Sequence, residues 1–120
     1  MAVGWAAKDT STQLTAITTV QYFDDTPTLD ANEYAHVQVV GNSDGTTDSL
    51  QVSVYSTLDP SGENWDTVPV YSFVLDCTSG ADNDVSFIVR DVYKFRVGVV
   101  RVGSTDTFVA DMGYRIATMS

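Results

Sequence analysis

The sequence predicts an all-β domain, an antiparallel β-sandwich of about seven or eight strands. Apolar and polar residues alternate with a period of two along most of the chain, and no helical period of useful length appears. These alternating segments recur roughly every 10 to 18 residues and are separated by Gly, Asn, Asp, Ser and Pro, the residues of turns. Since each such strand has one apolar face, two sheets must pack face to face to cover both.

Seven strands are expected between residues 13 and 118, and most have a clear inward face. The strand over 34–40 turns Ala35, Val37 and Val39 inward and His36 outward. The last strand alternates well from Phe108 to Ile116. The predicted strands cover residues 13–23, 34–40, 49–57, 68–76, 85–90, 92–102 and 106–118.

The fourth predicted strand, 68–76, is apolar on both faces. Val70 and Val74 lie on one face, and Tyr71, Phe73 and Leu75 lie on the other. We therefore expect a loop, the N-terminal arm or a partner chain to cover its second face.

The order of the strands is left open between a jelly roll and an immunoglobulin-like sandwich. Tyr93 is either the tyrosine corner of an immunoglobulin-like fold or an ordinary core tyrosine, and Gly98 is expected to mark a bulge. The chain divides into an extended N-terminal arm, residues 1–12, and a sandwich domain, residues 13–120.

The charge is strongly negative and uneven. Sixteen acidic residues oppose six basic ones, and no Lys or Arg occurs between Lys8 and Arg90. This field repels nucleic acids and anionic lipids, so neither is expected as a partner. The acidic, lysine-poor composition is also typical of a salt-adapted, halophilic or marine, source. No membrane span and no secretory signal are apparent, and we expect synthesis in a host cytoplasm.

The sequence offers no catalytic constellation and no transition-metal site. His36 is the single histidine and Cys77 the single cysteine, and they do not form a known ligand or nucleophile pattern. No cofactor is expected. Calcium at an acidic loop is the alternative, because hard cations take several oxygen ligands from turns. The three candidate groups are Asn42, Asp44 and Asp48; Asp59, Glu63 and Asp66; and Asp82 with Asp84.

Six residues are predicted to contact partners. An apolar arm has little reason to exist on a monomer, which suggests that Trp5 and Lys8 dock on a neighbouring subunit. Trp65 lies in a polar loop, where a large aromatic side chain often anchors a partner, although folding back onto the sandwich is the alternative. The outward basic residues of the late strands are expected to form one basic stripe: Lys94, Arg96 and Arg115.

The chain resembles the small head-decoration, or cement, proteins of tailed viruses of bacteria and archaea. The likeness is one of architecture: a sandwich of this size with an apolar arm, and the stretches 48–59, 65–67 and 93–97. The run Tyr93 to Val97 is equally similar to a late strand of fibronectin type III modules. The resemblance implies a homo-oligomer, a trimer or dimer, on the virion surface. Its arm would clamp adjacent subunits of the major capsid protein.

Two further functions remain open at this stage. A carbohydrate- or receptor-binding module of a tail, fibre or cell surface would use Trp65 and Tyr55. The other is a cell-surface or fibre immunoglobulin-like module, which would stay monomeric and not bind capsids.

Overall fold

A computed structural model describes residues 3–5, 8–43, 47–78, 82–102 and 108–119. The side chains of 3–5, 47–48 and 77–78 are not described. Within the described ranges, no helix is long and apolar enough to span a membrane. The strands are β1 (Val3–Trp5), β2 (Asp9–Thr10), β3 (Leu14–Ile17), β4 (Gln21–Tyr22), β5 (Glu33–Ser43), β6 (Thr47–Thr57), β7 (Tyr71–Thr78), β8 (Asn83–Val89), β9 (Lys94–Val102) and β10 (Phe108–Met119).

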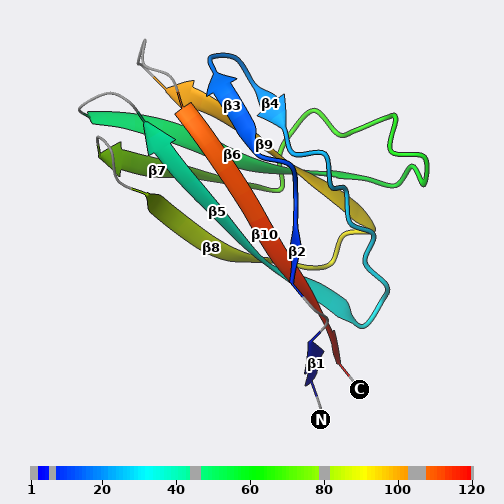
Figure 1. The fold of residues 1–120 in the computed structure, drawn as a ribbon. Helices are drawn as coiled ribbons and strands as arrows, with labels where there is room; N and C mark the ends of the chain where they lie inside the picture. Colours follow the sequence, from blue (N-terminus) through cyan, green and yellow to red (C-terminus); the bar gives the residue numbers. More distant parts are fainter. Residues whose placement is uncertain (1–2, 6–7, 44–46, 79–81, 103–107, 120) are drawn as a thin grey trace.

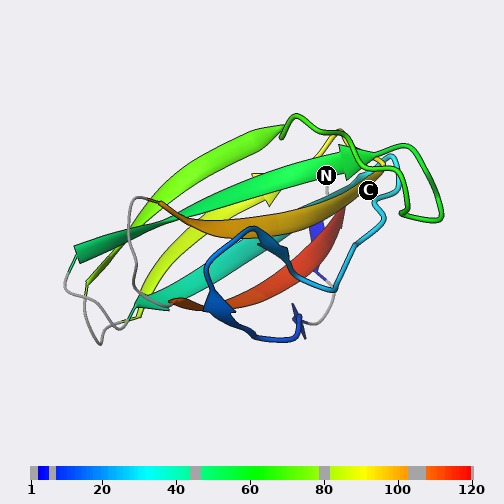
Figure 2. The ribbon, with the colours of Figure 1, turned by 90° about the horizontal axis from the view of Figure 1, so that it is seen from above.

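The strands form two antiparallel sheets that pack face to face as a sandwich (Figures 1 and 2). In sheet A, β8 pairs with β5, and β5 pairs with β10; the short strands β1, β2 and β3 pair with the other edge of β10. Sheet B has the order β4-β9-β6-β7. The long strands turn one face toward the opposite sheet, as the alternating sequence predicts.

The strand order is that of a jelly roll. The pairs β6–β7, β5–β8, β4–β9 and β3–β10 bring together strands that are progressively farther apart in sequence, and they alternate between sheet B and sheet A. From β3 onward, successive connections cross between the sheets, except the one from β6 to β7. Two interleaved four-stranded sheets of this order define the jelly roll. The immunoglobulin-like alternative, with three strands in one sheet and four in the other, is therefore wrong.

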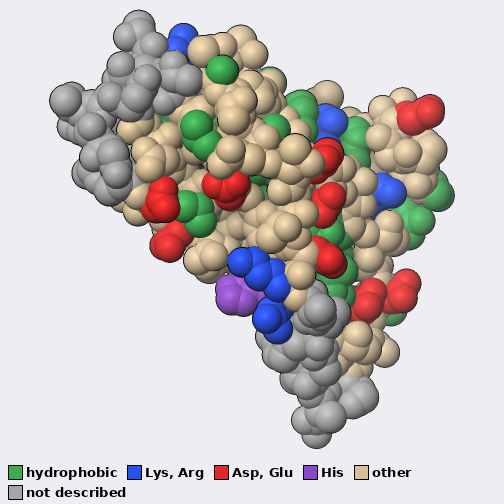
Figure 3. All heavy atoms as spheres, in the orientation of Figure 1, with side chains coloured by type: hydrophobic (Ala, Val, Ile, Leu, Met, Phe, Trp, Pro, Cys, Tyr) green, Lys and Arg blue, Asp and Glu red, His purple; other side chains and the backbone are tan. Residues whose placement is uncertain are grey.

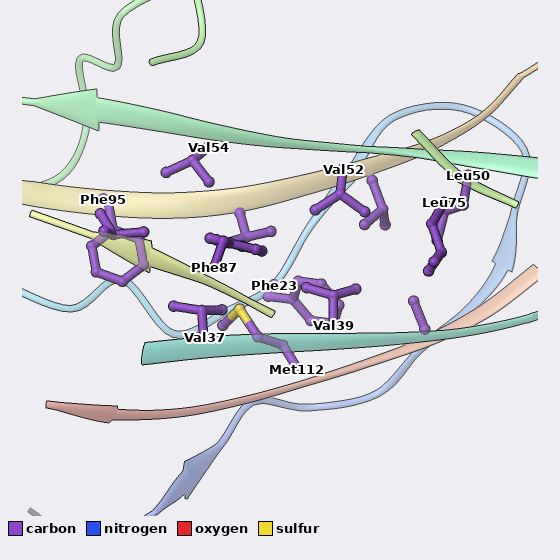
Figure 4. Packing of buried hydrophobic residues seen from close by; sticks show 14 of the residues in the cluster. Phe23, Val37, Val39, Leu50, Val52, Val54, Leu75, Phe87, Phe95 and Met112 are labelled. Carbon is purple, nitrogen blue, oxygen red and sulfur yellow. The ribbon is translucent and has the colours of Figure 1, made fainter. Parts of the chain in front are cut away.

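The predicted inward faces form the core between the sheets (Figure 4). Val37 and Val39 of β5 face Val52 and Val54 of β6, and all four are fully buried. Phe73 of β7 stacks on Phe87 of β8, with ring centroids 5.0 Å apart, which closes the sandwich on that side. The other large buried side chains include Ile17, Phe23, Leu50, Val89, Phe95, Val97, Phe108 and Met112.

The first predicted strand, 13–23, is wrong as a single strand. Its first part is β3, which pairs with β10 in sheet A, and its last part is β4, which pairs with β9 in sheet B. The chain crosses between the sheets in the intervening residues. Ala16, just before the crossing, has a φ of 52°, a left-handed conformation that is uncommon for a residue with a Cβ.

Two other local expectations also fail. Gly98 does not mark a bulge, because the pairing of β6 with β9 runs without a register shift from Ser49 to Thr57. Tyr93 is exposed and precedes β9, so it is neither a core residue nor part of an immunoglobulin-like corner.

The N-terminal segment, residues 1–12, lies along β10 where it is described. Val3 and Trp5 pair with Met119 and Ala117, and Thr10 pairs with Gly113. In Figure 1, β1 and the end of β10 run together away from the body of the sandwich. Docking of this segment on a neighbouring subunit remains a prediction.

Candidate functional site

The outward surface of sheet B carries little charge on a chain whose net charge is −10. Gln51 lies between Val100 of β9 and Val74 of β7, and Ser53 lies between Gly98 and Ser72. Asp76 lies at the end of this surface, where it accepts a hydrogen bond of 2.8 Å from Ser49. We call this surface the sheet B face; it consists of Tyr22, Gln51, Ser53, Tyr55, Ser72, Val74, Arg96, Gly98, Val100 and Val102.

Arg96 is held in a stack of aromatic rings at one end of the sheet B face. Its guanidinium carbon lies 3.6 Å from the centroid of the Tyr22 ring and 4.8 Å from that of Trp65. Tyr22 in turn meets Tyr55 edge to face, with centroids 5.8 Å apart. A guanidinium over aromatic faces is a favourable cation–π arrangement. Arg96 Nε is buried and has no hydrogen-bond partner among the described residues, so the rings are its main contacts.

Trp65 folds back onto the sandwich rather than standing free. Its Nε1 donates a hydrogen bond of 2.7 Å to the carbonyl of Gly62, and its ring lies over Arg96. The sequence placed Trp65 in a loop with two open interpretations, and this geometry supports the second. Contact of Trp65 with a partner stays a prediction.

A hollow of about 290 Å³ lies beside this stack, above Gly98. A Cβ added at Gly98 would lie 2.9 Å from Tyr22 Cε1 and 3.4 Å from Tyr55 Cε2, so glycine is what allows both rings to approach the strand. The floor is polar, because Gln51 Nε2 donates to Ser72 Oγ at 2.9 Å and the Ser53 and Ser72 hydroxyls are 3.1 Å apart. The walls also include Val20, Pro69 and Val100.

The loop that carries Trp65 is organised by Asp59. The Asp59 carboxylate accepts hydrogen bonds from the backbone N–H groups of Ser61 and Asn64, at 3.0 and 3.2 Å, and from the Ser61 hydroxyl at 2.7 Å. The hydroxyl and amide of Ser61 are the main causes that lower the pKa of Asp59 to about 2. Lys94 Nζ donates to the carbonyl of Pro60 at 3.4 Å and so ties the loop to β9.

Calcium at an acidic loop stays a prediction, and the structure shows what the candidate side chains contact. The oxygens of Asp59 are engaged by the loop itself, and Asp66 accepts a hydrogen bond from Ser56 at 3.2 Å. Asp82 likewise accepts one from Asn42 at 2.9 Å. Within the described residues, no group of three or more acidic, His or Cys side chains is placed to hold a metal ion. Asp44 and the side chain of Asp48 lie outside the described part.

The predicted single basic stripe is wrong. Lys94 and Arg96 lie on β9 in sheet B, whereas Arg115 lies on β10 in sheet A, on the opposite side of the sandwich. Sequence alone could not assign these strands to different sheets. Arg115 is instead opposite His36 of β5.

A small basic cluster does form on the outer face of sheet A. Lys8, His36 and Arg115 line a shallow hollow of about 180 Å³, together with Gln38, Ser86, Gly113 and Tyr114. Figure 3 shows the blue side chains beside the purple His36, with acidic side chains farther along the same face.

The predicted strand 68–76, which is apolar on both faces and contains most of β7, has one of these faces exposed. Val74 is 63% exposed, and Val68 and Val70, which lead into β7, are 75% and 46% exposed. The prediction of a partner chain over this face remains untested. Of the residues on the sheet B face, sequence reasoning singled out Arg96 and Tyr55 but missed Tyr22 and Gly98, because their partnership depends on the pairing of β4 with β9.

No protein-family model matches the sequence, and no curated protein matches it significantly. Among solved structures, the chain is similar to a protein of the Bacillus endospore appendages, described as a novel family of disulfide-linked pili. The TM-score is 0.57 and the identity 18%, over 98% of this chain and 89% of that one. It is also similar to a protein of infectious bursal disease virus, Gx strain, with a TM-score of 0.54 and 12% identity.

At these identities the likeness shows the fold alone. The second match covers 98% of this chain but 33% of the viral chain, so this chain is similar to about one third of that viral protein. The jelly-roll sandwich is thus shared with components of a pilus and of a virus.

Proposed function

We propose that the chain is a non-enzymatic structural protein of a virus particle, which stabilises the capsid by binding across adjacent subunits of the major capsid protein. The observation that carries this proposal is the sheet B face, a partly apolar surface on a strongly acidic domain, whose charged member, Arg96, is held among aromatic rings. The similarity of the fold to proteins of a virus and of a pilus supports a role in an assembly.

The energetics favour burial of the sheet B face. Val74 and Val102 are among the exposed large apolar side chains of the described residues, and Val68 and Val70 extend the same surface. Each valine that a partner covers contributes up to about 1.5 kcal/mol, at roughly 25 cal/mol per Å² of apolar area. Several exposed apolar side chains on one face are typical of protein–protein contacts. The acidic remainder of the surface would keep decorated particles apart from one another.

The decisive experiment asks where the native protein is found. Particles purified from a culture of the source organism are probed with an antibody to this chain, by immunogold electron microscopy and quantitative mass spectrometry. We expect labelling of virus particles in a fixed ratio to the major capsid protein. Labelling of cellular fibres, or recovery of the chain free of any assembly, would overturn capsid decoration.

A second function, glycan binding, is favoured by one observation, the hollow above Gly98. Two tyrosine rings beside an amide and a hydroxyl match the stacking and hydrogen-bonding chemistry of sugar recognition. A glycan array separates the two functions when the Tyr55→Ala variant is compared with the native chain. Glycan binding that is lost in Tyr55→Ala, together with no particle labelling, would replace the first proposal with this one.

A further inference from the structure

Among the described strands, β7 is a sheet edge that pairs on one side only. In the order β4-β9-β6-β7, β7 pairs with β6 and with no other described strand. Such an edge offers a row of backbone donors and acceptors to any strand that fits against it, and natural proteins block exposed edges with charge, proline or short length. Of the outward residues of β7, Ser72 and Val74 carry no such block, and Asp76, nearer the end of the strand, carries the one charge.

The other described edges are blocked or less apolar. The opposite edge of sheet B is β4, which has two residues. The β10 side of sheet A is covered by the short strands β1, β2 and β3. At the remaining edge, β8 has Asp84 and Ser86 as outward residues before Ile88, and Arg90 follows it. Of the two long edge strands, β7 and β8, β7 therefore has the more exposed apolar side chain: Val74 is 63% exposed and Ile88 is 43% exposed.

The sequence of β7 is complementary to itself in one antiparallel register. When a two-fold axis passes through Val74, the two exposed valines lie side by side on the outer face. On the same face, Ser72 of each copy lies opposite Asp76 of the other, so a hydroxyl donor meets a carboxylate. On the inner face, Phe73 lies opposite Leu75. A shift by two residues in either direction would instead place the Asp76 carboxylate beside an apolar valine.

We propose that β7 pairs antiparallel with β7 of a second copy about an axis through Val74, joining two B sheets into one continuous sheet. This pairing rests on the proposed function in one respect, because both treat the chain as a structural subunit of an assembly. An interface of this kind is isologous and closes at the dimer. In this pairing the exposed Val74 side chain of each copy lies against that of the other.

Charge makes this pairing dependent on salt. Two copies, each with a net charge of −10, repel at low ionic strength. The screening length falls from about 10 Å at 0.1 M salt to about 3 Å at 1 M. Since the contact itself is largely uncharged, the dimer fraction should rise between these two concentrations. An interface made of ion pairs would show the opposite trend.

Disulfide trapping tests the register. In a Cys77→Ser background, Val74→Cys places two thiols at the axis, within the roughly 4.4–6.8 Å Cα separation that a disulfide requires. Ser72→Cys is the matched control, because its two copies lie about 13 Å apart along the paired strands. We expect the Val74→Cys chain to cross-link at least about tenfold faster under mild oxidation. Equal rates would overturn the register.

Solution mass tests the interface without a cross-link. Analytical ultracentrifugation at about 1 M NaCl should show the native chain shifting with concentration from 13.0 kDa toward twice that mass. Val74→Lys should remain a folded monomer, whereas Ile88→Lys on the β8 edge should still dimerise. A native chain that stays monomeric, or loss of dimer in Ile88→Lys instead, would refute pairing through β7.

These outcomes are separable from those of the proposed function. A chain that labels virus particles but stays monomeric and fails to cross-link overturns the β7 pairing alone. A chain that pairs through Val74 but is absent from virus particles overturns capsid decoration alone.

Discussion

The Tyr22 ring packs against the backbone of Gly98, so closely that a Cβ at Gly98 would lie 2.9 Å from Tyr22 Cε1. The ring is not free to yield, because Arg96 lies over one of its faces and Tyr55 meets its edge. Because Gly98 has no Cβ, the Tyr22 ring can pack against the strand and the hollow on the sheet B face remains.

Gly98→Ala should therefore destabilise the protein by about 1–3 kcal/mol, the usual range for forcing a packed group to move. Gly113→Ala is the control, because a Cβ there would meet the flexible end of Lys8, at 2.6 Å from Cε, and this side chain can swing into solvent. Urea unfolding of both variants measures the difference. Equal stabilities of the two variants would contradict the tight packing at Gly98.

Phe95→Ala should cost about 3–5 kcal/mol, because it removes a fully buried ring from the centre of the core. Val74→Ala should change the stability of the monomer by about 0.5 kcal/mol or less, since Val74 is exposed. Chemical denaturation at low salt and low protein concentration makes the comparison. A large loss in Val74→Ala under these conditions would mean that β7 is packed within the monomer.

Arg96→Lys should destabilise the protein by about 0.5–2 kcal/mol, although it keeps the charge. Lysine cannot reproduce the planar stack between Tyr22 and Trp65, which are 3.6 and 4.8 Å from the guanidinium carbon. The Trp65 indole N–H should also exchange faster with solvent. Arg115→Lys, an exposed residue of sheet A, is the control and should be close to neutral. Unchanged exchange at Trp65 in Arg96→Lys would remove the evidence for the stack.

Asp24 should titrate well below an ordinary aspartate. Hydrogen bonds from the side chains of Ser11 and Thr12, and then from the Thr12 backbone, lower its pKa from 3.8 to about 2. A lowered pKa in the folded state gives stability that is complete above pH 3.8 and is lost as the pH falls through about 2. NMR titration of the carboxyl carbons measures the midpoint. In a Ser11→Ala, Thr12→Ala chain we expect the midpoint to move back toward 3.8.

Tyr114 should resist ionisation at alkaline pH. Partial burial, and then the hydrogen bond of 3.0 Å that its hydroxyl donates to Asp25, raise the pKa of Tyr114 above its ordinary value of 10.0. The resulting stability is complete below pH 10 and is lost as the pH rises beyond it. The native chain should consequently lose stability more steeply than Tyr114→Phe in this range. Parallel losses in an alkaline urea-unfolding series would show that the phenol ionises freely.

The fold class could be predicted from the sequence because burial follows the two-residue period. The inward residues expected on β5, β6, β8 and β9, such as Val37, Val52, Phe87 and Val97, are the ones that the structure buries. The crossing between 13 and 23 could not be predicted, because an apolar run has the same pattern whether it stays in one sheet or passes to the other. The break at Ala16, with its positive φ, has no signal in the residue type.

The site was harder to predict than the fold. The distribution of Lys94, Arg96 and Arg115 over two sheets depends on strand order, which periodicity does not encode. Tyr22 and Gly98 are 76 positions apart in sequence and become neighbours through the β4–β9 pairing. The exposed second face of β7, in contrast, had a clear signal, since Val70 and Val74 broke the alternation.

The central position of β10 also has a consequence for how the protein is made. β10 pairs with β1, β2, β3 and β5, so sheet A lacks the strand that joins its two halves until residues 108–119 have left the ribosome. Long-range pairings of this kind form slowly, and unpaired strands are prone to aggregate meanwhile. The abundant carboxylates upstream of residue 90 would keep the nascent polypeptide dispersed through that interval.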